Sequence, residues 1–289
     1  MDDFEVFAEA HYSFGNMLNK LGRMEEAAAS YRQAIALNPD FAEAHTNLGI
    51  ILYSNGDIES AIESLTKAND IDSKLRTSEL VLTILRARKA REETEVINDN
   101  INKSNYNVGL TPNPFCLNRV VEPELVVSLI EMQSREMDEA IHTPVFGNGR
   151  CSPDYNMFNV DFPIIKTVES DLIRLMEEAV KSEIYLYDSW FNIYGAGAGI
   201  PPHAHINEFD ENKYLNFAKQ KYSLVYYVSV GDQDCSEPGI FKIYDPKEEI
   251  LPCEGMIIII PAGRRHSAVY NGKKDRIIIG TNFYSIDCF

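Results

Sequence analysis

The 289-residue sequence predicts an α+β protein with an N-terminal array of helical hairpins and a C-terminal, mostly β domain flanked by helices. The first quarter repeats itself with a period of about 34 residues, a length that one pair of helices fills. From residue 184 onward, short β-rich runs bounded by Gly, Pro, Asn or Asp follow one another. The content of 45% hydrophobic and 25% charged residues is that of an ordinary globular protein.

Two repeats occupy residues 8–41 and 42–75. The first holds His11, Phe14, Gly15, Leu18, Gly22, Ala27, Tyr31 and Ala34, and the second holds His45, Leu48, Gly49, Leu52, Gly56, Ala61, Leu65 and Ala68 at the same positions. Small residues stand where paired helices would touch, and a glycine is placed to end the first helix of each pair. The pattern resembles the tetratricopeptide repeat, which implies helical hairpins that bind a protein or peptide. Residues 77–92 predict a capping helix, so the repeat domain spans 1–92.

Residues 93–115 are polar and rich in turn-forming residues, which predicts a linker. The domain over 116–289 begins with two helical patterns, near 122–142 and 163–183. Its β-rich runs are 190–194, 222–230, 240–244, 255–260 and 276–285. Short strands at this spacing predict an antiparallel sandwich or barrel.

The charge of the chain narrows the classes of partner. The formal net charge is −17, and such an acidic chain repels nucleic-acid phosphates and anionic membrane surfaces. No apolar run approaches the length of a membrane span, and the acidic N-terminus does not look like a signal peptide. Five scattered cysteines without a CxxC pair argue against a disulfide framework or a zinc–cysteine site. We therefore expect a cytoplasmic protein.

Three histidines form the candidate metal site. His203 and His205 follow a glycine-rich turn at i and i+2, and residues at this spacing on a strand point to the same face. His266 follows an apolar strand and would complete the site from a second strand. Neutral imidazoles bind iron, copper, nickel or zinc. Arg276 opens another apolar strand, where its planar guanidinium can bind a carboxylate through two hydrogen bonds.

These motifs, in the order Tyr194-x2-Gly-x5-His203-x-His205 and Pro-x4-His266-x9-Arg276, resemble the 2-oxoglutarate/Fe(II) oxygenases, in particular their prolyl-4-hydroxylase-like branch. The resemblance covers about residues 184–286 and implies a double-stranded β-helix. It also implies that His203 and His266 bind Fe(II), that Arg276 anchors the co-substrate 2-oxoglutarate, and that Tyr194 lines the co-substrate pocket. The implied activity is that of a dioxygenase, which consumes O2 and hydroxylates a substrate that we expect to be peptidyl, for example prolyl.

One position departs from the family pattern, because His205 stands where the carboxylate ligand belongs. Three interpretations stay open. The site works with three histidines, or Glu208 or Asp210 from the following loop completes it, or the oxygenase chemistry has been lost.

Two other functions compete with the dioxygenase. A cupin-like metalloprotein would use His203, His205 and His266 without the co-substrate, and cupins have no general need for Arg276. A non-catalytic adaptor would use the repeats alone.

Overall fold

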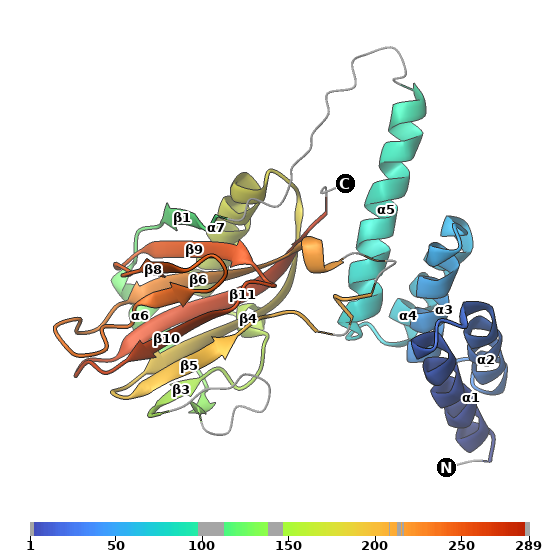
Figure 1. Cartoon of the computed structure of the whole chain (residues 1–289), viewed down its shortest axis with the longest axis horizontal. Coiled ribbons are helices and arrows are strands. Elements are labelled where there is room, and N and C mark those ends of the chain that lie inside the picture. Colours follow the sequence, from blue (N-terminus) through green and yellow to red (C-terminus); the bar gives the residue numbers. More distant parts are fainter. Residues whose placement is uncertain are drawn as a thin grey trace. The chain divides into compact units, whose positions relative to one another are not determined.

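The computed structural model describes residues 3–97, 113–137, 147–207, 209–212, 215 and 217–286. The chain divides into two compact units, Met1–Asn105 and Tyr106–Phe289 (Figure 1). The division falls inside the predicted linker over 93–115, of which residues 98–112 lie outside the described residues. No helix among the described residues is long and apolar enough to cross a membrane.

The first unit consists of two helical hairpins followed by a fifth helix. The helices are α1 (Asp3–Lys20), α2 (Met24–Leu37), α3 (Ala42–Ser54), α4 (Ile58–Ile71) and α5 (Arg76–Ile97). A Cβ atom on Gly15 would lie 2.6 Å from Tyr31, and one on Gly49 would lie 2.7 Å from Leu65. These two glycines, at equivalent positions of the two repeats, therefore let the helices of each pair approach closely. Helix α5 includes the predicted capping helix and continues to Ile97.

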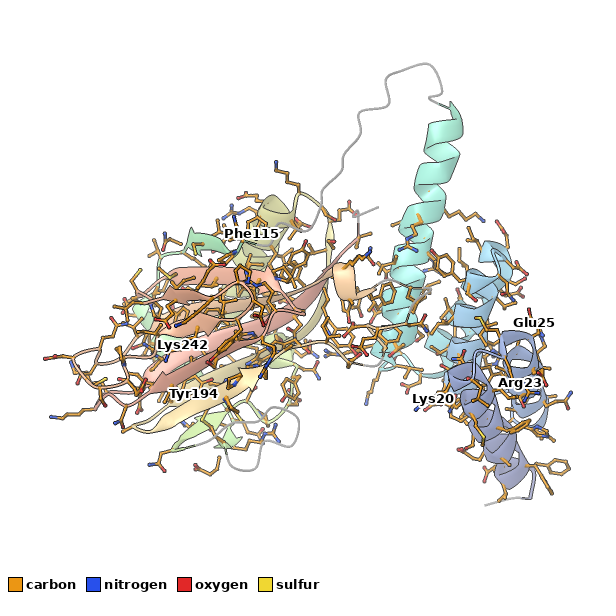
Figure 2. The ribbon with its side chains drawn as sticks, viewed as in Figure 1. Lys20, Arg23, Glu25, Phe115, Tyr194 and Lys242 are labelled. Atoms are coloured by element: carbon orange, nitrogen blue, oxygen red, sulfur yellow. The ribbon has the colours of Figure 1, made fainter. Side chains whose placement is uncertain are left out.

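The second unit is an antiparallel sandwich of two sheets, so the predicted fold class is confirmed. Among the described residues, seven strands in the order β1-β9-β6-β11-β4-β3-β2 form one sheet, and four in the order β5-β10-β7-β8 form the other. The strands are β1 (Phe115–Asn118), β2 (Arg135–Glu136), β3 (Gly149–Cys151), β4 (Ile184–Tyr194), β5 (Ala198–His203), β6 (Lys221–Ser229), β7 (Phe241–Ile243), β8 (Glu248–Ile250), β9 (Met256–Pro261), β10 (His266–Tyr270) and β11 (Arg276–Ser285). Tyr194 and Lys242, both labelled in Figure 2, come from different sheets.

The larger sheet has two buried faces because its central strands are apolar on both sides. Ile277, Ile279 and Phe283 of β11 join the core formed with α6 (Pro123–Glu131) and α7 (Pro163–Val180). Ile278 points the other way and joins the core between the two sheets. Successive strand residues alternate between faces. Arg276 and Asn282, an even number of residues from Ile278, are therefore placed on the face that looks toward the smaller sheet.

The helix predicted near 122–142 is wrong in its second half. Helix α6 ends at Glu131, because Met132 adopts an extended conformation with ψ 149°. The chain then forms the short strand β2, and residues 138–146 lie outside the described residues. The second predicted helix forms as α7, which begins at Pro163 and stops where Lys181 takes a left-handed conformation.

Candidate metal centre

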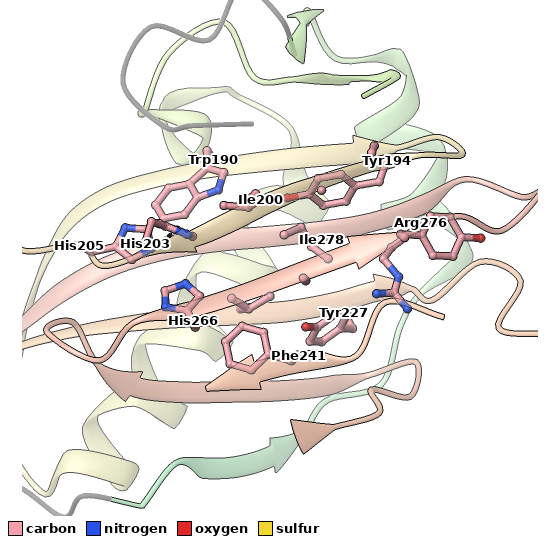
Figure 3. Close-up of a pocket in the computed structure, with 15 residues that line it drawn as sticks. Trp190, Tyr194, Ile200, His203, His205, Tyr227, Phe241, His266, Arg276 and Ile278 are labelled. Carbon is pink, nitrogen blue, oxygen red and sulfur yellow. Dashed lines mark hydrogen bonds between the residues drawn. The ribbon is translucent and has the colours of Figure 1, made fainter. Parts of the chain in front are cut away.

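Strand pairing brings two of the three histidines together. His203 ends β5, His266 begins β10, and their Cα atoms are partners in the antiparallel ladder of the smaller sheet. His205 lies two residues beyond the end of β5, in a loop rather than on the strand that the sequence predicts. Its backbone N–H donates to the carbonyl of Ala262, 2.8 Å away, which holds the loop beside β9 and β10. The three imidazoles consequently converge at one end of a cavity between the sheets (Figure 3).

The ring geometry suits one metal ion. One ligand nitrogen from each histidine lies within 4.8 Å of the others. The Nδ1 atoms of His203 and His266 lie 2.9 Å and 3.2 Å from the carbonyls of Pro201 and Arg264. Because a carbonyl only accepts hydrogen bonds, each Nδ1 carries the proton and each Nε2 offers a lone pair. Such orientation by a backbone carbonyl is common for metal-binding histidines.

Burial keeps the histidines neutral at physiological pH. Desolvation, followed by repulsion from His203, lowers the pKa of His266 to about 3. Desolvation also lowers the pKa of His203, and it lowers that of His205 to well below the ordinary value. The neutral imidazole is the form that binds metals, so the site needs to release no proton from these rings at pH 7.

The cavity that contains the histidines is narrow and mostly apolar. Its volume is about 40 Å³, enough for about three water molecules, so a larger ligand enters only if lining side chains move. The indole of Trp190 stacks on His205 with the ring centres 5.7 Å apart, and Phe241 packs against His266. Arg276 lines the other end (Figure 3).

Arg276 is a buried cation without an acidic partner among the described residues. It is 2% exposed, and its Nη1 and Nη2 donate to the carbonyls of Gly239 and Pro238 at 2.7 and 2.6 Å. Its guanidinium carbon lies 4.7 Å from the ring centre of Tyr270. Burial lowers the pKa of Arg276, yet guanidinium remains charged at every physiological pH. Carbonyls and aromatic faces orient the charge without neutralising it, so the cavity holds an uncompensated positive charge.

Tyr194 lies at the candidate site, whereas Asp210, one of the two alternative carboxylate ligands, does not. Tyr194 lines the same cavity, and its hydroxyl accepts a hydrogen bond from the amide of Asn192 at 2.9 Å. Asp210 lies apart from the group of ligand atoms formed by the histidines. Its carboxylate pairs with Lys221 at 2.8 Å and accepts from the hydroxyl of Tyr284 at 2.5 Å. Glu208 lies outside the described residues.

Sequence reasoning missed the residues behind His205. The amide nitrogen of Asn282 lies 3.4 Å from Nδ1 of His205, and the same nitrogen donates to Asp188 at 3.2 Å. One signal was present in the sequence, because Asn282 lies an even number of residues after Arg276 on the same strand. Trp190, the single tryptophan of the chain, is buried and also lines the cavity.

Comparison with known families identifies the first unit. Residues 15–56 match the family model described as TPR repeat, and residues 42–75 match the tetratricopeptide repeat. The N-terminal unit contains tetratricopeptide repeats. No curated protein sequence matches the chain.

Three solved structures are similar to parts of the chain. The chain is similar to an oxidoreductase of the 2OG-Fe(II) oxygenase family from Burkholderia pseudomallei, with 12% identity, a TM-score of 0.42, and coverage of 68% of this chain and 90% of that one. It is also similar to a prolyl-4-hydroxylase from Pseudomonas putida, with 14% identity, a TM-score of 0.41, and coverage of 61% and 94%. A third similar structure is MamA, with 26% identity, a TM-score of 0.29, and coverage of 33% and 55%.

Proposed function

We propose that the second unit is an Fe(II)- and 2-oxoglutarate-dependent dioxygenase that hydroxylates a peptidyl substrate, for example at a prolyl residue. The observation that carries the proposal is the cavity itself. Three neutral imidazoles converge at one end, and a buried guanidinium without an acidic partner among the described residues lies at the other. A transition metal fits the first end, and a carboxylate fits the second.

The proposed metal ligands are His203, His205 and His266. When bound, Fe(II) together with O2 and 2-oxoglutarate supplies the oxidising chemistry, in which 2-oxoglutarate yields succinate and carbon dioxide while a C–H bond of the substrate is hydroxylated. The donor set fits this metal, since imidazole nitrogen is a usual ligand of iron. The pocket supplies orientation and dryness, because Trp190 and Phe241 cover two of the rings.

Arg276 is the proposed anchor of the co-substrate. The guanidinium has five N–H donors, and three are directed at the carbonyls of Val230, Pro238 and Gly239. The remaining donors can bind a carboxylate, and the aromatic ring of Tyr270 keeps the guanidinium plane in place. Tyr194 lies in the same lining and is the proposed second contact to the co-substrate.

The repeats are the proposed binding site for a protein or peptide substrate. Helical repeat arrays form extended surfaces that bind peptides. Within the first unit, a hollow of about 720 Å³ is lined by apolar Leu48 and Leu52 and by charged residues of both signs, among them Arg32, Glu63 and Lys67. A peptide that carries both charges therefore suits this surface better than a purely acidic or purely basic one.

The test is an anaerobic titration of the metal-free full chain with Fe(II) and 2-oxoglutarate. The signal measured is the visible charge-transfer band of the chelate. We expect a band with the native sequence and a weaker affinity for 2-oxoglutarate in Arg276→Met. Arg174→Met, which removes an exposed arginine of α7, is the matched control and should leave the affinity unchanged.

The outcomes separate the three candidate functions. A band that survives Arg276→Met at equal affinity would show that the anchor is assigned wrongly. Metal binding without any band favours the cupin-like metalloprotein, which the three-histidine donor set also fits. If the chain binds neither metal nor 2-oxoglutarate, the repeats act as an adaptor and the oxygenase proposal is refuted.

A further inference from the structure

Two residues behind His205 form a hydrogen-bonded pair between neighbouring strands. Asp188 of β4 and Asn282 of β11 are Cα partners in the larger sheet. The backbone N–H of Asn282 donates to Asp188 Oδ1 at 3.0 Å, and its side-chain Nδ2 donates to Oδ2 at 3.2 Å. The same Nδ2 lies 3.4 Å from Nδ1 of His205. Asp188 and Asn282 thus make up an outer layer of the candidate metal centre.

The carboxylate fixes which way the amide of Asn282 points. An ionised carboxylate only accepts hydrogen bonds, so the amide NH2 must face Asp188. The NH2 group has two hydrogens, and the second is directed at Nδ1 of His205. Flipping the amide, so that its oxygen and nitrogen exchange places, would put Oδ1 against the carboxylate. In the observed orientation Asn282 Oδ1 is buried and has no hydrogen-bond partner among the described residues.

This orientation decides where His205 carries its proton. Since Nδ1 of His205 accepts from Asn282, the proton of the neutral ring lies on Nε2. Nε2 of His205 lies 3.2 Å from Nε2 of His203, whose own proton is on Nδ1 facing Pro201. The two rings therefore match as donor and acceptor, with the N–H of His205 directed at the lone pair of His203. At every contact from Asp188 through Asn282 and His205 to His203, a donor therefore faces an acceptor.

We propose that Asp188 and Asn282 are positioning residues that set the hydrogen-bond polarity at His205 and so make it the weakest of the three metal ligands. The proposal rests on the metal centre of the proposed function. His203 and His266 present lone pairs at Nε2. To bind a metal, His205 must move its proton from Nε2 to Nδ1, where the amide of Asn282 offers no acceptor while Asp188 holds it. No proton leaves the ring in this exchange.

The usual arrangement at metal-binding histidines has the opposite polarity. The outer nitrogen donates to a carboxylate or carbonyl, which raises the basicity of the ligand nitrogen, and loss of such a partner weakens metal binding about 10–100-fold. His203 and His266 have this arrangement through backbone carbonyls, and His205 does not. A metal is consequently held mainly by His203 and His266, with His205 as a reversible third ligand.

The experiment exchanges the two outer residues. In the double variant Asp188→Asn/Asn282→Asp, a carboxylate faces His205 and an amide lies behind it, with no change in net charge and almost none in size. Metal-free full-length protein is titrated with Co(II) and the visible d–d absorption is followed. We expect the exchange to tighten Co(II) binding by roughly 10–100-fold. The single variant Asp188→Asn, which gives His205 no carboxylate, is the matched control and should gain less.

His205→Ala completes the design. It should lower the Co(II) affinity of the native sequence by less than about tenfold, and it should abolish the whole gain in the exchanged variant. An exchanged variant that binds no tighter, or whose gain persists without His205, overturns the proposal while the metal centre stands.

A second measurement does not depend on metal. Nitrogen-15 NMR of the metal-free chain reports the protonated nitrogen of each imidazole, and we expect Nε2–H for His205 in the native sequence and Nδ1–H in the exchanged variant. A native His205 protonated at Nδ1 overturns the proposal. If native and exchanged chains both fail to bind Co(II), the proposed metal centre is refuted, and with it the role of the pair as ligand-positioning residues, whatever tautomer the spectra show.

Discussion

The ion pair between Lys221 and Asp210 allows a prediction whose size follows from burial. The side chains are 3% and 0% exposed, and the ammonium lies 2.8 Å from the carboxylate. In Lys221→Met the aliphatic stem is kept and the positive charge is lost. Asp210 then retains the hydroxyl of Tyr284 at 2.5 Å and the backbone N–H of Asn207 at 3.0 Å. In the part of the chain that the structure describes, the variant leaves a buried carboxylate with two donors and no cation.

Removing one partner of a buried pair typically costs about 3–5 kcal/mol of unfolding free energy. Since two donors remain on Asp210, we expect the lower end, about 3 kcal/mol. The double variant Lys221→Met/Asp210→Asn removes the uncompensated charge as well. It should recover most of the loss and remain within about 1 kcal/mol of the native sequence.

The assay is urea unfolding, with tryptophan fluorescence as the signal. Trp190 is the single tryptophan and belongs to β4, so the signal reports on the second unit alone. Lys247→Met is the matched control, because its ion pair with Glu249 is 74% and 43% exposed and should contribute less than about 1 kcal/mol. A loss below about 1 kcal/mol in Lys221→Met, or a double variant as unstable as the single one, would refute the reasoning.

Three further predictions concern other parts of the molecule. The pKa of His266 is about 3 in the folded chain against about 6.5 when unfolded, so between these pH values the unfolded chain binds more protons. The unfolding free energy should therefore fall by up to about 1.4 kcal/mol per pH unit as the pH drops below 6.5. Urea unfolding at stepped pH measures this slope, and His266→Asn should flatten it. Gly239→Ala puts a Cβ 1.6 Å from Arg276 at a φ of +76°, and should weaken 2-oxoglutarate binding at least about tenfold while Co(II) binding stays unchanged in titrations. Gly49→Ala puts a Cβ 2.7 Å from Leu65 and should destabilise the repeats by about 2 kcal/mol, measured from the thermal loss of helical circular dichroism.

The parts of the fold that were predictable depend on short-range patterns. The helix pairs follow from the repeat period of the sequence, and α7 follows from apolar residues at helical spacing after a proline. Strand β5 was harder to delimit, because it contains Gly199, Pro201 and Pro202, residues that usually interrupt strands. It forms at the outer edge of the smaller sheet, where β10 is its one paired neighbour among the described strands. An edge strand tolerates proline since one row of its N–H groups needs no partner.

The candidate site was only partly predictable for a related reason. His203, His205 and Arg276 lie close to landmarks in the sequence, a glycine-rich turn and the start of an apolar strand. The contact between Asp188 and Asn282 joins residues 94 positions apart and depends on the register of β4 against β11. That register is set by tertiary pairing, and a shift of one strand by one residue would turn its side chain to the other face, away from its partner.

The network around Asp210 explains why a carboxylate close in sequence does not replace the one that the family pattern expects. Its oxygens are occupied by Lys221 and Tyr284, so moving it toward the histidines would strand a buried ammonium. With His203, His205 and His266 as its proposed ligands, the metal site has three neutral donors, and a divalent ion beside Arg276 would give the cavity about three positive charges. A dianion such as 2-oxoglutarate leaves about one. In a low-dielectric cavity, the smaller remaining charge favours a doubly charged ligand over a singly charged one. A histidine in place of the carboxylate therefore favours a dicarboxylate co-substrate, although it binds the metal less strongly.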